Sequence, residues 1–105
     1  MLSKFEQEIE LLGRHLAILR LVINQGPIGI IKLSELSGFP QHKVRYSLRV
    51  LEQQNLIKAS SHGATATLKA KKFMRTLPGR IKRLNRKIKS LETLENFTSR
   101  TRRVL

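Results

Sequence analysis

Two arginines, Arg45 and Arg49, stand four residues apart in the segment 41–54 and have the clearest chemical use in the sequence. At that spacing in a helix, the two side chains project from neighbouring turns of one face. A guanidinium can donate two parallel hydrogen bonds to O6 and N7 of guanine, and the amide of Gln41 can read adenine. The segment therefore carries side chains suited to the base edges in the major groove of duplex DNA.

Three further side chains of the same segment suit contacts with a nucleic-acid backbone. Lys43 lies near the start of the expected helix, where free backbone N–H groups also attract anions. His42 is a candidate phosphate contact, and Tyr46 offers a hydroxyl for phosphate or a ring for a thymine methyl. The alternative interpretation is an ordinary solvated face, because exposed Arg and Lys are common on helices.

Such side chains need a helix that buries its opposite face, and the apolar spacing predicts one. Val44, Leu48 and Leu51 recur at helical intervals, so we expect a helix over 41–54. A shorter helix is expected over 31–37, and the apolar residues of both would share one core.

The connections around these helices carry residues typical of turns. Gly38 suits a left-handed backbone after a helix end, and Asn55 tolerates the same conformation. Residues 28–30 read as a short extended piece. The segment 56–70 is predicted to form a β-hairpin, with a turn over 61–64 and a second strand over 65–70. On this hairpin, Lys58, His62 and Lys69 are candidate contacts to a DNA backbone.

An amphipathic helix is predicted over residues 2–25, ended by Gly26 and Pro27. Its apolar stripe is widened after Gly13, so we expect that part to be packed in the core. Before Gly13 only a narrow seam remains, which suits a partner helix and includes Leu2, Phe5 and Ile9. His15 lies among the apolar positions and is expected to be a partly buried, hydrogen-bonded core residue rather than a metal ligand.

The C-terminal segment is predicted to form a short helix over 71–77 and a long basic helix from Gly79 to about Phe97, with Pro78 in its first turn. Its apolar residues follow a spacing typical of a helix-pairing seam. The expected dimer contacts of this seam are Ile81, Leu84, Ile88 and Leu91. Arg80, Arg83 and Lys87 beside the seam are candidate phosphate contacts, the alternative being a solvated coiled-coil face. Three glutamates of the first helix can pair with these bases within a subunit or between two.

Charge and composition restrict the class of protein. The 105 residues include 21 Lys and Arg against seven acids, all Glu, for a net charge of +14. The excess lies in the second half of the chain, which an even solubilising coat would not produce, so a polyanionic partner is indicated. There is no cysteine and no long apolar run, so a disulfide framework and a membrane span are not expected. We expect a protein of the cytoplasm, associated with the nucleoid.

The stretch from Gly26 to Ala70 resembles archaeal winged helix-turn-helix transcriptional regulators. The resemblance rests on Leu-Ser-Glu-Leu-Ser-Gly-Phe-Pro, on His-Lys-Val-Arg-Tyr-Ser-Leu-Arg-Val-Leu-Glu and on the following Leu-Ile. It implies a mainly α (α+β) fold in which a small β-hairpin forms the wing. It also implies a winged domain over 1–78, a basic dimerisation helix and tail over 79–105, and a sequence-specific DNA-binding homodimer.

Two other functions compete with this one. The basic C-terminal segment favours non-specific binding of nucleic acid, as in chromatin or RNA proteins, although few aromatic residues are present for base stacking. A winged helix can also act as a protein–protein adaptor of the transcription machinery. No carboxylate pair, nucleophile with a base or glycine-rich phosphate loop is recognisable, so we expect no enzyme. No cofactor, metal or small-molecule effector is indicated.

Overall fold

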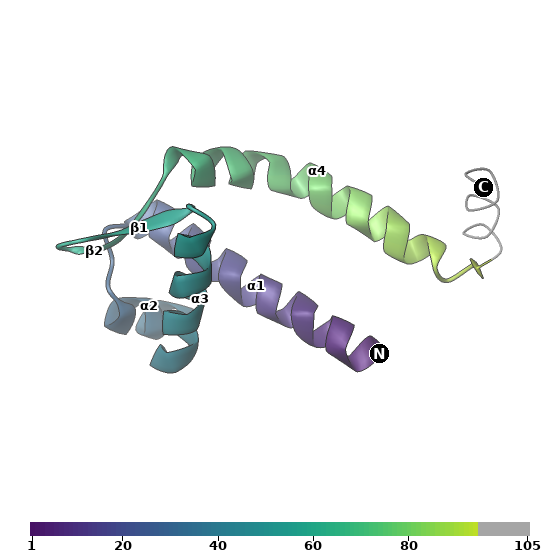
Figure 1. The fold of residues 1–105 in the computed structure, drawn as a ribbon, viewed down its shortest axis with the longest axis horizontal. Coiled ribbons are helices and arrows are strands. Elements are labelled where there is room, and N and C mark those ends of the chain that lie inside the picture. The colour runs from purple at the N-terminus through teal and green to yellow at the C-terminus, as the bar shows by residue number, and fades with distance from the viewer. Residues whose placement is uncertain (95–105) are drawn as a thin grey trace. The chain divides into compact units, whose positions relative to one another are not determined.

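The computed structural model of the chain describes residues 1–94 (Figure 1). Within them the chain forms four helices and one β-hairpin. The elements are α1 (Leu2–Gln25), α2 (Ile30–Ser37), α3 (Gln41–Gln53), β1 (Ile57–Ser60), β2 (Gly63–Ala66) and α4 (Leu68–Ser90). The predicted helices over 2–25, 31–37 and 41–54 are confirmed to within one residue at each end. The mainly helical chain with its small antiparallel hairpin is compatible with the expected α+β class.

The chain divides into two compact units, Met1–Lys72 and Phe73–Leu105. The division falls inside α4, whereas the sequence suggested a boundary after Pro78. The first unit contains α1, α2, α3, the hairpin and the first residues of α4. It also contains the segment 41–54, so the candidate base-reading side chains belong to a folded unit with a core of its own.

The core of the first unit joins the three helices to the hairpin. Its buried apolar side chains come from the helices, from β1 and from two connecting segments, namely Ile18, Leu19, Val22, Ile28, Leu33, Val44, Leu51, Leu56, Ile57 and Ala70. The buried residues of α1 all follow Gly13, as its widened stripe predicted. Burying one Leu, Ile or Val side chain contributes about 1.5–3 kcal/mol relative to leaving it exposed, so this cluster is the main source of stability for the unit.

The hairpin pairs with a third extended segment. Strands β1 and β2 are antiparallel, with Ile57 opposite Ala66 and Ser60 opposite Gly63. On the other edge of β2, the N–H of Ile28 donates to the carbonyl of Ala64 (3.1 Å), and the N–H of Ala64 donates back to Ile28 (2.8 Å). The expected extended piece after α1 is therefore confirmed, and it fixes the hairpin to the end of α1.

Both predicted left-handed residues adopt that conformation. Gly38 has φ of 79° after the last residue of α2, and Asn55 has φ of 60° after α3. The turn between α2 and α3 is also held by Ser34, whose hydroxyl donates to the carbonyl of Phe39 at 2.6 Å. The turn at Gly38 sets the direction in which α3 leaves α2, and the turn at Asn55 leads the chain from α3 into the hairpin.

The prediction of a second strand over 65–70 is wrong. Strand β2 ends at Ala66, and Leu68 begins α4. The hydroxyl of Thr67 explains the early helix start. It accepts a hydrogen bond from the N–H of Ala70 (3.2 Å), as an N-cap side chain does, and lies 2.8 Å from the carbonyl of Asn55, to which it donates. Lys69 consequently belongs to α4 and not to the hairpin.

The predicted break between two C-terminal helices is also wrong, because α4 runs without interruption through Pro78. A proline in a helix interior removes one backbone hydrogen bond, here to the carbonyl of Met74. The surrounding turns keep their own hydrogen bonds, so the helix continues past it. It ends at Ser90 rather than near Phe97, which itself lies outside the described residues together with the expected tail over 98–105.

Candidate nucleic-acid interface

Helix α3 is mounted on the rest of the first unit by one buried face. Val44, Ser47 and Leu51 are buried, and α3 packs against α1, α2 and β1. The predicted contact residues of this helix lie outside that buried face, and each is exposed. These residues are Gln41, His42, Lys43, Arg45, Tyr46 and Arg49. The structure therefore presents outward the side chains that the sequence singled out.

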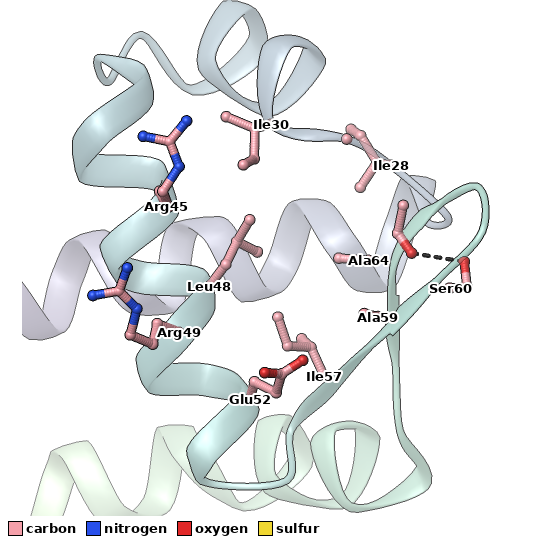
Figure 2. A pocket seen from close by; sticks show the side chains of 12 residues that line it. Ile28, Ile30, Arg45, Leu48, Arg49, Glu52, Ile57, Ala59, Ser60 and Ala64 are labelled. Carbon is pink, nitrogen blue, oxygen red and sulfur yellow. Dashed lines mark hydrogen bonds between the residues drawn. The ribbon is translucent and has the colours of Figure 1, made fainter.

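Arg45 and Arg49 stand on successive turns of α3 beside a groove of about 440 Å³ (Figure 2). Helix α3 forms one wall of the groove, and the hairpin forms the other. Leu48 points from α3 toward the hairpin, and Ile57 lies below Leu48 in the view of Figure 2. The two arginines and Glu52 are the charged residues that line the groove.

The floor of the groove is apolar and was not expected from the sequence. It is formed by Ile28, Ile30, Leu48, Ile57 and Ala64, which come from four separate parts of the chain. Only the packing of the hairpin against α3 and its pairing with Ile28 bring them together. The periodicity of each element indicates which residues face inward, but it does not indicate which inward faces leave a groove between them.

The guanidinium groups of Arg45 and Arg49 have no carboxylate partner within residues 1–94. The single ion pair among these residues joins Lys32 to Glu35 on α2, at 3.9 Å. A positive charge without a partner on an exposed helix face remains available for a phosphate or for the acceptor atoms of a base edge. The electrostatics of this face consequently favour an anionic ligand.

A buried polar cluster fixes α3 on α1. The hydroxyl of Ser47 accepts a hydrogen bond from Nε of Arg14 (3.2 Å) and lies 2.8 Å from Nδ1 of His15. Burial, and to a lesser degree the neighbouring charge of Arg14, lowers the pKa of His15. A neutral His15 can accept the proton of Ser47, so all three groups are satisfied. The expected hydrogen-bonded core histidine is confirmed, and its partner on α3 is new information.

Ser47 is the functional residue that sequence reasoning missed. A signal was present, since Ser47 stands three residues after Val44 and four before Leu51, on the buried face of the helix. A small polar residue at such a position needs a hydrogen-bond partner from another element.

The hairpin presents Lys58 and His62 to solvent. Its turn is held by Ser60, whose hydroxyl donates to the carbonyl of Gly63 (2.7 Å) and accepts from the N–H of His62 (3.2 Å). Lys69 is different, because its ammonium donates to the carbonyl of Gln54 at 2.8 Å. The expectation that Lys69 lies on the hairpin is therefore corrected, since this side chain binds the end of α3.

The candidate residues of the second unit lie on α4 and immediately after it. Arg80, Arg83 and Lys87 are exposed, and α4 contains no acidic residue over its whole length. Among the expected dimer contacts there, Ile81 is half-buried and the others are exposed. The latter are Leu84, Ile88 and Leu91, and Leu91 follows the last residue of the helix.

The expected contacts on α1 are exposed as well. Leu2 is 68% exposed, and Phe5 and Ile9 are each 48% exposed. Apolar side chains this open are unusual when they occur in a row along one helix face. Both predicted seams are thus present in the structure as accessible surfaces.

Over residues 1–94, no helix is long and apolar enough to cross a bilayer, and no group of three or more potential ligands could hold a metal ion. No protein-family model matches the chain, and no curated protein matches it either.

Proposed function

We propose that the chain is a sequence-specific DNA-binding transcriptional regulator with a winged helix-turn-helix fold, acting as a homodimer. Helix α3 is the recognition helix and enters the major groove, while the β1–β2 hairpin is the wing and contacts the backbone. The observation that carries the proposal is the exposure of Arg45 and Arg49, free of carboxylate partners within residues 1–94, on a helix whose opposite face is buried.

The dimensions support this use of α3. An α-helix with its side chains is about 10–12 Å wide, and the major groove of B-DNA is about 12 Å wide. The order of elements, with Ile28 pairing to the hairpin and α2 and α3 between them, is compatible with a winged helix. In such a fold the helix reads bases while the hairpin contacts the adjacent backbone.

The experiment is a selection of bound duplexes from random DNA, followed by affinity measurements on the selected site and on a scrambled duplex. Arg45→Ala and Arg49→Ala should each cost about 1–3 kcal/mol on the selected site and much less on the scrambled one. Arg20→Ala is the matched control, because Arg20 is exposed on α1 and does not line the groove. Equal losses on both duplexes would show that the two arginines bind only phosphate.

A second candidate function is non-specific binding of nucleic acid, and the composition of α4 favours it. This helix carries many bases and no acid, which suits a polyanion of any sequence. A salt series with competing bulk DNA separates the two functions. Steep salt dependence without a preferred duplex supports the second candidate, whereas retention of one duplex in excess bulk DNA supports the first. Absence of DNA affinity at physiological salt would instead favour the adaptor function.

The homodimer forms part of the proposal because of the exposed seams on α1 and α4. Two-fold symmetry would place two recognition helices on one duplex, which doubles the contacts and sets the spacing of the half-sites. A cytoplasmic, nucleoid-associated location follows from this function, and no small-molecule effector is included in it.

A further inference from the structure

The seams on the first and last helices have the same length and the same spacing. Leu2, Phe5, Ile9 and Leu12 follow one another at intervals of three, four and three residues. Ile81, Leu84, Ile88 and Leu91 follow the same intervals. Seven of these eight side chains are 40–68% exposed, and Ile81 is half-buried. At about 1.5 Å per residue, each seam extends about 15 Å, so one seam can cover the other from end to end.

The charges beside the two seams are opposite. Residues 1–12 contain Glu6, Glu8 and Glu10 against a single base, Lys4. Residues 80–89 contain six bases and no acid. With 3.6 residues per turn, Glu6 and Glu8 fall on the two sides of the first seam, where charged residues of paired helices meet. The surface beside one seam is therefore complementary to the surface beside the other.

Pairing of like seams would bring equal charges together. Two α4 helices in contact would bring together two segments that each carry six bases and no acid over residues 80–89, and two α1 segments would bring together two sets of three glutamates. Like charges at such positions destabilise a helix pair. Contact between an α1 seam and an α4 seam removes both repulsions and replaces them with attractions.

We propose that the α1 seam of one copy packs on the α4 seam of a second copy, and that two-fold symmetry repeats the contact. The inference rests on the proposed homodimer and specifies its interface. Each copy contributes the acidic segment 2–12 to one contact and the basic segment 81–91 to the other. Because a single pairing of this length is marginal, the two symmetric contacts stabilise the dimer together.

A charge exchange tests the pairing. One variant carries Glu6→Lys and Glu8→Lys, and a second carries Arg80→Glu and Lys87→Glu, which lie seven residues apart on one side of the seam. Sedimentation velocity of the full chain without DNA should show the wild type as a dimer and each variant with at least a tenfold higher dimer Kd. An equimolar mixture should return the Kd to within about threefold of wild type. In the mixed dimer, one contact has both charges exchanged and the other keeps both native charges.

Each other arrangement gives a different result. Self-pairing of α4 predicts that the Glu6 and Glu8 variant stays dimeric, and a wild type that is monomeric at all concentrations overturns the dimer altogether. Failure of the mixture to regain dimers overturns contact between copies. Glu35→Lys with Glu52→Lys is the control for the Glu6 and Glu8 variant, because it raises the net charge by the same amount outside both seams and should leave the Kd unchanged. Circular dichroism melting curves confirm that the variants remain folded.

The experiments test the DNA-binding function and the pairing of the α1 and α4 seams independently, so either proposal can be refuted while the other stands. Arg45→Ala should reduce the preference for the selected duplex and leave the dimer Kd as it is. A chain that passes the charge exchange but binds no DNA refutes the function and retains the interface. A chain that prefers one duplex but fails the charge exchange refutes this interface alone.

Discussion

Nδ1 of His15 lies 2.8 Å from the hydroxyl oxygen of Ser47, in a buried hydrogen bond that joins α1 to α3, the proposed recognition helix. The neutral imidazole is the form that accepts the hydroxyl proton. The bond therefore links the packing of α3 against α1 to the protonation state of one histidine.

This bond predicts a loss of stability in mild acid. Burial and the charge of Arg14 hold the pKa of His15 below its ordinary value of about 6.5, so the unfolded chain binds the proton more tightly than the folded chain. The contribution of His15 is complete above about pH 6.5 and declines as the pH falls toward the lowered pKa. Thermal unfolding between pH 5 and pH 8 should show this decline. His15→Gln should flatten it, whereas His62→Gln in the exposed turn should not.

Removal of the Ser47 hydroxyl should destabilise the unit. Ser47→Ala leaves Nε of Arg14 and Nδ1 of His15 without their buried partner, at a cost of about 1–3 kcal/mol in the free energy of unfolding. Urea denaturation followed by circular dichroism measures this change. Ser61→Ala, in the exposed hairpin turn, should change the free energy by less than about 0.5 kcal/mol. Equal effects of the two substitutions would contradict a role for Ser47 in holding α3 on α1.

Gly63→Ala should weaken the attachment of the hairpin. Gly63 has φ of 119°, and a Cβ atom there would lie 2.5 Å from the carbonyl carbon of Ile28. The backbone conformation alone costs a residue other than glycine about 1–3 kcal/mol, and the close approach adds to it. Chemical denaturation should show a loss at least this large. Gly13→Ala is the control, since a Cβ there meets nothing within 4 Å, and an alanine inside α1 should stabilise the helix.

Lys58→Ala separates backbone contacts from base reading. Loss of one phosphate contact should weaken binding to the selected and scrambled duplexes by the same factor, and reduce the slope of log K against log salt by about one. Lys69→Ala should leave that slope unchanged, because the ammonium of Lys69 is engaged with the carbonyl of Gln54. A change in the ratio of the two affinities with Lys58→Ala would mean that the hairpin also reads sequence.

The elements with a clear apolar period and a clear stop were predictable from the sequence. Gly26 and Pro27 end α1 where expected, and Gly38 and Asn55 adopt the left-handed backbone that their residue types allow. The errors arose where two local signals compete. Thr67 suits a strand by its alternation with Ala66, but its hydroxyl caps α4 instead. Pro78 is typical of a helix start, yet an established helix continues through it.

Only part of the candidate site could be predicted from the sequence. Exposure of Arg45 and Arg49 follows from the period of α3 alone, because the apolar residues fix which face is buried. The bond between His15 and Ser47 and the apolar floor of the groove depend on how separate elements pack. The sequence of one chain does not show which distant residues contact each other, so neither feature could be predicted from it.

The reciprocal hydrogen bonds between Ile28 and Ala64 have a consequence for the energetics of recognition. A hairpin joined only at its own ends would sample many orientations. A ligand that held it in one orientation would bind less tightly, because the hairpin would lose conformational entropy on binding. Here any tilt must either break both bonds or carry the chain after α1 with it. The backbone of the hairpin is thus held in one position without a ligand, so little backbone entropy would remain to be lost if the hairpin binds a duplex as proposed.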